Sequence, residues 1–228
     1  MQPHEFWQEI EPSTTLDAER SGVVFHPARF DDGRLLRLPI RPLADGTHAL
    51  ASLIINQASF AVVEAIANDL ARKLAPCEVE VVAGLPTLGL TLASAVARRL
   101  GHARYVPLGT SRKFWYREEL SVPLSSITTP EQQKRLYVDP RMLPLLEGRR
   151  VAVIDDVLSS GASMVAGLTL MNLCGVEPVA IGAAMLQSER WRERLAALDR
   201  KWPARVVAVL RTPLLARAAD GKWRDAAT

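Results

Sequence analysis

Strand-like and helix-like segments alternate along most of this 228-residue chain, and this alternation constrains its fold more than any other feature. The clearest strand is Arg150–Ile154, an apolar run flanked by charge, which is typical of a strand covered on both faces. Helices are expected on either side of it, at about Gln57–Leu74 and at about Ala162–Cys174. Strands that alternate with helices of about 10–15 residues predict right-handed crossovers. We therefore expect an α/β fold with a twisted parallel sheet flanked by helices.

Shorter segments continue the same alternation. We expect four more strands and two more helices, namely strands at Val79–Val82, Arg104–Leu108, Pro178–Met185 and Arg205–Leu210, and helices at Thr91–Leu100 and Glu189–Arg200. A long polar stretch of weak periodicity, at about 109–141, separates the two halves of this series. Ligands of such sheets collect at the carboxyl ends of the strands, so the residues that follow each strand are the candidates for a site.

The first part of the chain follows a different pattern. Three short strand-like runs, at Val23–Phe25, Leu35–Ile40 and His48–Leu53, are separated by two turn-forming runs that contain Asp and Gly. This pattern predicts a small antiparallel, β-rich hood, to which the C-terminal tail is a further candidate contributor. We expect one domain over residues 1–228, with 1–53 as an N-terminal arm and hood and 54–210 as the core.

Composition excludes several classes of protein. Hydrophobic residues make up 48% of the chain, enough for a sizeable core without disulfides or metal staples. The net charge of +3 is too small for the dense cationic stripe of a nucleic-acid binder, although it suits an anionic small molecule. Cys77 and Cys174 form no metal or disulfide pattern, and the four histidines lie singly. Without an apolar signal segment or an apolar run of about 18 residues, we expect a cytoplasmic protein that does not enter membranes.

The segment Val151–Ser163 carries the strongest chemical signal. A buried strand brings the adjacent carboxylates of Asp155 and Asp156 to the rim of the sheet, and a short turn rich in Ser and Gly then opens a helix. Such a turn can direct backbone N–H groups and hydroxyls at a phosphate, aided by the helix dipole, and Gly161 allows close approach. The carboxylates suit the vicinal hydroxyls of a sugar, or a magnesium ion held mainly by the ligand's own oxygens. The alternative is an ordinary strand–turn–helix with a solvated acidic pair and a serine cap.

This segment resembles the motif of type I phosphoribosyltransferases that binds 5-phosphoribosyl 1-pyrophosphate (PRPP), an apolar strand followed by two acidic residues and a Ser/Thr-rich turn. The resemblance implies that Asp155 and Asp156 hold the ribose 2′- and 3′-hydroxyls. It also implies that the 5-phosphate is cradled by Ser159, Ser160, Gly161, Ala162 and Ser163. Magnesium is the cofactor implied, and PRPP and a small heterocyclic base are the implied partners. We also expect a homodimer.

Two upstream segments extend the resemblance. Val82–Gly89, a strand that ends in a Gly-containing turn, resembles the family's pyrophosphate loop, which binds largely through backbone amides in a tight, sometimes cis, conformation. The loop residues are Leu85, Pro86, Thr87, Leu88 and Gly89. Arg112 and Lys113 match the Arg-Lys pair that begins the cationic loop of the adenine-type branch. They are the expected catalytic cations. Asp155 and Asp156 are the other residues expected to take part in catalysis.

The chain also departs from the family. The adenine-type pyrophosphate loop usually carries an Arg near the position of Leu88, and the acidic stretch that follows the mobile loop is replaced by residues 121–129. The orotate-type Arg after the phosphate turn is absent from Met164–Ala166. The resemblance covers about Val79–Met185, whereas the outer segments, which normally build the base-binding hood, lie outside it. A purine-like base is favoured over orotate because the Leu92–Lys113 region resembles the adenine-type branch.

The resemblance implies a magnesium-dependent enzyme in which a ring nitrogen of the base displaces pyrophosphate from C1 of PRPP through an oxocarbenium-like transition state. Catalysis would use magnesium and loop cations on the leaving group, and a closed loop would exclude water. We expect the stretch at about Gly109–Pro130 to be mobile without ligand and to cover the reaction centre with Phe114 to Tyr116 on closure. Two alternatives stay open, a non-catalytic PRPP-binding regulator on the same fold, and another α/β protein with a phosphate-binding turn.

Overall fold

The computed structural model describes residues 2–15, 20–124 and 134–227. Its larger sheet has five strands in the order β10-β9-β8-β4-β5, and every neighbouring pair is parallel. All the carboxyl ends of these strands therefore lie on one edge of the sheet. The strands are β4 (Val81–Gly84), β5 (Val106–Pro107), β8 (Val151–Leu158), β9 (Ala180–Gln187) and β10 (Val206–Thr212).

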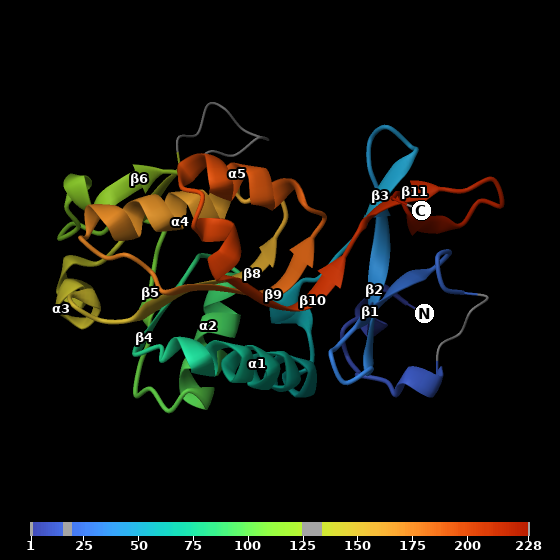
Figure 1. The fold of residues 1–228 in the computed structure, drawn as a ribbon, viewed down its shortest axis with the longest axis horizontal. Helices are drawn as coiled ribbons and strands as arrows, with labels where there is room; N and C mark the ends of the chain where they lie inside the picture. Colours follow the sequence, from blue (N-terminus) through green and yellow to red (C-terminus); the bar gives the residue numbers. More distant parts are fainter. Residues whose placement is uncertain (1, 16–19, 125–133, 228) are drawn as a thin grey trace.

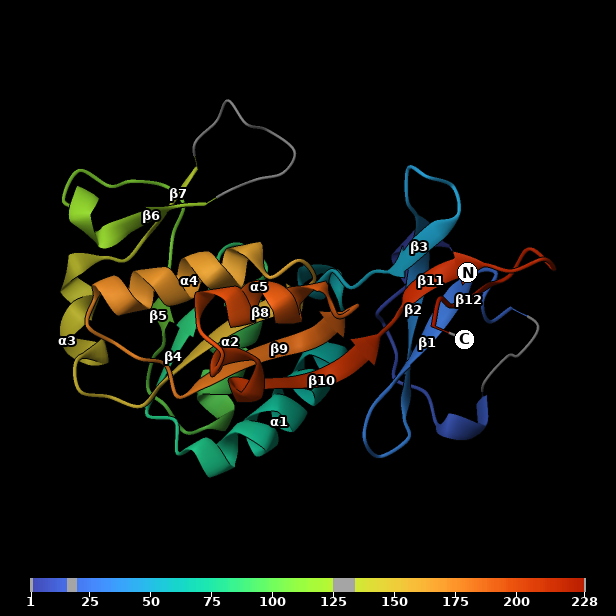
Figure 2. The ribbon, with the colours of Figure 1, turned by 45° about the horizontal axis from the view of Figure 1, so that its top comes forward.

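Helices cover both faces of this sheet (Figures 1 and 2). α1 (Phe60–Leu74) and α2 (Gly89–Arg99) pack on one face, and α4 (Ala162–Leu173) and α5 (Arg190–Leu198) pack on the other. The Ser59 hydroxyl accepts a hydrogen bond from Val62 N and so caps the amino end of α1. α4 is apolar on most of its surface. The parallel sheet lies under it, and α5 and the small two-stranded sheet described below pack against it.

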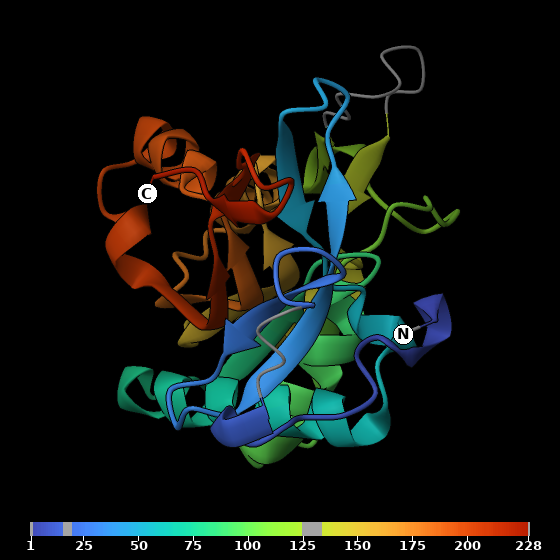
Figure 3. The ribbon, with the colours of Figure 1, turned by 90° about the vertical axis from the view of Figure 1, so that its right-hand side faces the viewer.

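A second, antiparallel sheet forms the hood, with the strand order β1-β2-β3-β11-β12. Figure 3 views the molecule from this side and shows that both termini lie here. The sheet therefore takes strands from both ends of the chain, and it stands beyond the carboxyl ends of β9 and β10 (Figure 1). Its strands are β1 (Phe25–Arg29), β2 (Leu35–Pro42), β3 (His48–Ala51), β11 (Leu214–Arg217) and β12 (Trp223–Asp225).

One buried side chain links the two sheets directly. Gln187 is the last residue of β9, and its Nε2 donates a hydrogen bond of 2.6 Å to the backbone carbonyl of Ala51 in β3. β10 also leads through Pro213 straight into β11. Hydrogen bonding and chain continuity thus fix the hood to the edge of the sheet at which ligands are expected.

The polar stretch after β5 contains a third, two-stranded sheet. It consists of β6 (Ser121–Pro123) and β7 (Arg135–Tyr137), which are antiparallel and pack on α4. The short helix α3 (Leu143–Leu146) follows and leads into β8. None of the helices in the described part of the chain is both long and apolar enough to cross a membrane.

The structure confirms the predicted parallel α/β fold and corrects several boundaries. The first hood strand is Phe25–Arg29 rather than Val23–Phe25, because residues 20–24 form a turn that returns to Phe25. The helix predicted from Gln57 begins at Phe60, since Ser59 caps it and a 3₁₀ turn occupies residues 55–57. Most importantly, β8 does not end before the acidic pair but continues to Leu158, because Val157 and Leu158 pair with β9.

Candidate functional site

The candidate site lies where β4 ends beside the carboxyl-terminal half of β8. The two strands pair in parallel, with Gly84 opposite Ile154, so the loop after β4 and the end of β8 meet at one edge. Leu85 N donates a hydrogen bond of 2.9 Å to the Ile154 carbonyl, which ties the start of that loop to β8. Because ligands of parallel sheets bind at this edge, the position fits a binding site.

Asp155 and Asp156 lie inside β8 rather than beyond it. Asp155 pairs with Ala183 of β9 and is only 7% exposed, whereas Asp156 is partly buried. The backbone N–H of Asp156 donates to Asp155 Oδ1 at 2.9 Å. Burial raises the pKa of Asp155 well above its usual range, and the neighbouring Asp156 charge adds to this rise. Burial raises the pKa of Asp156 as well, so the pair binds a proton readily and gains from a ligand that donates hydrogen bonds.

The predicted pyrophosphate loop, residues 85–89, packs directly against this pair. A Cβ atom on Gly89 would lie 2.7 Å from Asp155 Oδ1 and 2.9 Å from Asp155 Cα, so glycine is the residue that allows this contact. The peptide bond between Pro86 and Thr87 is cis. Leu88, at the position where the adenine-type branch usually carries an Arg, packs partly buried against the hydrophobic core. The loop therefore offers backbone groups, and no cationic side chain, beside the acidic pair.

The predicted phosphate turn follows β8 immediately and leads into α4. Gly161 has φ +78°, and a Cβ atom there would lie 2.9 Å from Leu195 Cδ1. Ser159 and Ser160 are partly exposed and Ser163 is exposed, while α4 begins at Ala162 and leaves its first N–H groups without helical partners. A cavity of about 100 Å³ lies here, lined by Asp155 and residues 157–164. Backbone N–H groups of the first helical turn, hydroxyls and a helix amino end around one cavity suit an anion such as phosphate.

Arg112 and Lys113 are not brought to this cavity. Both are exposed in the loop that follows β5, and Arg112 Nη1 lies 3.3 Å from Glu118 Oε2. Among the described residues, no hydrogen bond or ion pair joins either cation to the acidic pair or to the Ser159–Ser163 turn. Arg112 and Lys113 can therefore act at the site, as expected from the sequence, only if the loop moves. Residues 125–130 of the predicted mobile stretch lie outside the described part of the chain.

Aromatic contacts hold the far end of this cationic loop. Trp115 Nε1 donates to Asp139 Oδ2 at 3.2 Å, and the Arg141 guanidinium lies 4.6 Å from the centre of the Trp115 ring. Hydrogen bonds from Arg141 lower the pKa of Asp139 to about 2. Tyr116 contacts the Tyr137 ring at 5.9 Å between centroids. In this arrangement Phe114, 96% exposed, is far more accessible than Trp115 and Tyr116.

Arg190 and Trp191 also border the phosphate turn, although no motif of the sequence marks them. Arg190 Nη2 lies 3.4 Å from Ser159 Oγ, and Trp191 packs against Gly161. Their only sequence signal is position, since both follow the carboxyl end of β9 and therefore reach the same edge as the turn.

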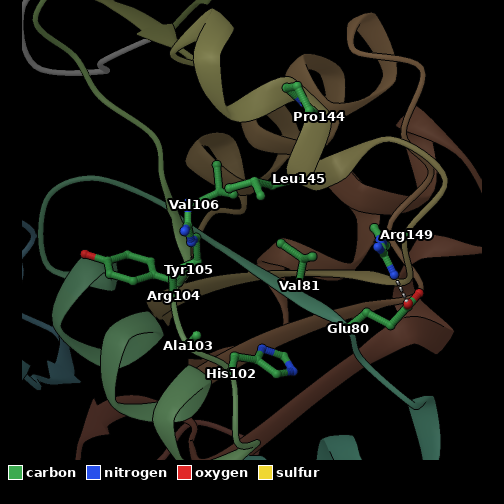
Figure 4. A pocket seen from close by; sticks show the side chains of 10 residues that line it. All are labelled: Glu80, Val81, His102, Ala103, Arg104, Tyr105, Val106, Pro144, Leu145 and Arg149. Atoms are coloured by element: carbon green, nitrogen blue, oxygen red, sulfur yellow. Dashed lines mark hydrogen bonds and ion pairs between the residues drawn. The ribbon is translucent and has the colours of Figure 1, made fainter.

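A larger cavity of about 330 Å³ lies at the opposite, amino-terminal edge of the sheet (Figure 4). Its lining includes His102, Arg104 and an ion pair in which Arg149 Nη1 lies 2.8 Å from Glu80 Oε1. None of the predicted site residues lines it. Size alone therefore does not mark the site, and the smaller cavity beside Asp155 combines position with the matching chemistry.

Several phosphoribosyltransferases are similar to this chain in sequence. An adenine phosphoribosyltransferase of Parafrankia sp. is 31% identical over 151 residues, which cover 66% of this chain and 77% of that protein. A hypoxanthine/guanine phosphoribosyltransferase of Methanosarcina acetivorans is 30% identical over 138 residues, and the match spans 60% of this chain and slightly less than two thirds (64%) of that relative.

The fold has counterparts among solved structures. The crystal structure of adenine phosphoribosyltransferase from Thermoanaerobacter pseudethanolicus matches with a TM-score of 0.54 at 20% identity, covering 67% of this chain and 81% of that one. This is a likeness of fold alone. The profile of the phosphoribosyl transferase domain matches residues 50–209, which include β4, β8 and the loops that form the candidate site. The chain therefore belongs to the phosphoribosyl transferase domain family.

Proposed function

We propose that this protein transfers the 5-phosphoribosyl group of PRPP to a ring nitrogen of a purine-like base and releases pyrophosphate. One observation carries the proposal, which is that the acidic pair of β8, the 85–89 loop and the Ser159–Ser163 turn converge at a single edge of the sheet. Membership of the phosphoribosyl transferase family and relatives named for adenine and for hypoxanthine and guanine support it.

Each part of the site has a role that its chemistry suits. The oxygens of Asp155 and Asp156 accept hydrogen bonds from the ribose 2′- and 3′-hydroxyls, which relieves the repulsion between two neighbouring carboxylates. The backbone N–H groups and hydroxyls of the Ser159–Ser163 turn bind the 5-phosphate. Backbone groups of the 85–89 loop bind pyrophosphate on the other side of the acidic pair. PRPP would thus span the edge from the turn to the loop, with the ribose over β8.

Magnesium fits this donor set only as an ion that arrives with the substrate. The described residues contain no group of three or more His, Cys, Asp or Glu side chains that could hold a metal by themselves. Asp155 and Asp156 are the carboxylates that would help hold it, and oxygens of PRPP and water would supply the other ligands. When bound, the ion would supply positive charge to the leaving pyrophosphate.

We propose that Arg112 and Lys113 supply the remaining positive charge when the loop closes. Changing both to Ala should lower kcat more than it weakens PRPP binding, because the charge on the leaving group is largest in the transition state. Steady-state kinetics combined with calorimetric titration of PRPP measures the two effects separately. Arg117→Ala, which removes a cation a few residues away, is the control. An equal effect on binding and on kcat would argue against the role.

The base defines the sharpest test of the proposed reaction. Purified protein with Mg²⁺ and PRPP should release pyrophosphate when a purine such as adenine, hypoxanthine or guanine is added, and should release little with orotate. Turnover of orotate without response to any purine would contradict the purine assignment. PRPP binding without pyrophosphate release from any base would instead favour the regulatory alternative, which the Leu88 side chain, packed at the place of the usual Arg, would suit.

A cytoplasmic location and a homodimer remain predictions. Light scattering of the purified protein would decide the second.

A further inference from the structure

Arg190 lies beside the phosphate turn although it belongs to a different β–α connection. It is the first residue of α5, just beyond the carboxyl end of β9. Its Nη2 lies 3.4 Å from Ser159 Oγ and its Nε lies 3.4 Å from Ser188 Oγ. The exposed guanidinium therefore lies between Ser188, which precedes α5, and Ser159, the first residue of the turn.

The backbone that carries Arg190 is packed firmly against the same turn. The side chain of Trp191 is buried, and its Nε1 donates to the Ser188 carbonyl at 3.1 Å. A Cβ atom on Gly161 would lie 3.3 Å from both the Cα and the carbonyl oxygen of Trp191. The start of α5 and the turn thus contact each other through backbone atoms, so the backbone of Arg190 lies close to the turn.

Arg190 also carries a positive charge that the described residues leave uncompensated. No carboxylate in the described ranges lies within 4.0 Å of it, whereas Arg192, two residues later, pairs with Glu189 at 2.9 Å. Serine hydroxyls at 3.4 Å are weak partners for a guanidinium, because charge-assisted hydrogen bonds to phosphate are about 2.7–2.9 Å long and stronger. A phosphate in the cavity would be the better partner.

The cavity itself lacks a cation. Its lining consists of Asp155, apolar side chains, serines and backbone N–H groups, none of which brings positive charge. A phosphate dianion at the turn would also lie near the acidic pair of β8. We propose that Arg190 is a substrate-binding residue, the cation that pairs with the phosphate at the Ser159–Ser163 turn. This inference rests on the proposed function, in which that phosphate is the 5-phosphate of PRPP.

The test compares two anions that would occupy different parts of the site. Ribose 5-phosphate offers only the 5-phosphate to the turn, whereas Mg-pyrophosphate binds at the 85–89 loop. Arg190→Gln should weaken ribose 5-phosphate binding at least tenfold in calorimetric titration and leave Mg-pyrophosphate binding within about twofold of wild type. Arg190→Lys keeps the charge but not the fork of donors, so its affinity for ribose 5-phosphate should lie between those of wild type and Arg190→Gln. Arg192→Gln, the matched loss of one charge on the same helix, should change neither.

The outcomes separate this inference from the proposed function. Wild-type ribose 5-phosphate affinity in Arg190→Gln, or an equal weakening of both anions, would overturn the role of Arg190 while leaving the reaction in place. A wild-type protein that binds neither PRPP nor ribose 5-phosphate would overturn the proposed function, and this inference with it. If Arg190→Gln fails to fold in a thermal melt, Arg190→Lys alone decides, through the same difference between the two anions.

Discussion

Asp155→Asn and Asp156→Asn are each expected to weaken Mg–PRPP binding at least tenfold, or about 1.4 kcal/mol. An amide keeps the shape of the carboxylate but loses the charge and one acceptor oxygen that the ribose hydroxyls would use. Calorimetric titration of PRPP measures the effect, and thermal melting checks the fold. Wild-type affinity in both variants would remove the acidic pair from the proposed site.

The same substitution should not lower stability, and at Asp155 it should raise it. Burial raises the pKa of Asp155 in the folded protein. Asp155 therefore keeps its proton to a higher pH in the folded protein than in the unfolded chain, where the pKa of an Asp side chain is about 4. Folding stability is therefore lost as pH rises from about 4 through the folded-state pKa. Asn does not titrate, so the gain in melting temperature of Asp155→Asn over wild type should grow between pH 4 and pH 7. A gain that shrinks over this interval would contradict the burial of the charge.

Gly89→Ala should damage both stability and turnover. The added Cβ would lie 2.7 Å from Asp155 Oδ1, 2.9 Å from its Cα and 3.1 Å from the Ile154 carbonyl, so backbone atoms must move. Overpacking of this kind costs about 1–3 kcal/mol, and each kcal/mol lowers the melting temperature of a domain of this size by about 2–4 °C. Displacement of the acidic pair from the ribose should lower pyrophosphate release on the order of a hundredfold.

A matched control exists in the same protein. Gly109 lies just after β5, has no left-handed backbone angle, and a Cβ atom there meets nothing within 4 Å. Gly109→Ala should therefore leave the melting temperature within about 1–2 °C of wild type, as surface substitutions usually do. Similar losses in the two variants would show that Gly89 is not special and that the loop does not need its close contact with β8.

The sequence was sufficient to predict the core because its strands and helices have strong apolar patterns. Val151–Ile154, for example, can bury its apolar side chains on both faces only between two layers of helices. The structure confirms such a strand in the centre of the sheet. β6 and β7 could not be predicted, because strands of three residues are too short to show a period of two.

Site features that depend on distant neighbours were also beyond local pattern. The pair Asp155–Asp156 was expected at the rim of the sheet, yet Asp155 is buried because Ala183 pairs with it on one side and Gly89 packs on it from another strand's loop. The contact of Arg190 with the phosphate turn likewise depends on strand order, since β9 lies next to β8 in space. A sequence pattern gives the strands but not which two are neighbours.

The hood is built from strands of both chain ends, and this has a consequence for synthesis on the ribosome. β3 pairs with β11 through Leu50 opposite Leu214, so the edge of β3 stays open until the whole core has been made. Contacts this distant in sequence form late, and an open strand edge is a template for pairing with other chains. A chain that stops after β10 would expose that edge permanently. Loss of the last two strands should therefore appear first as self-association of the newly made protein.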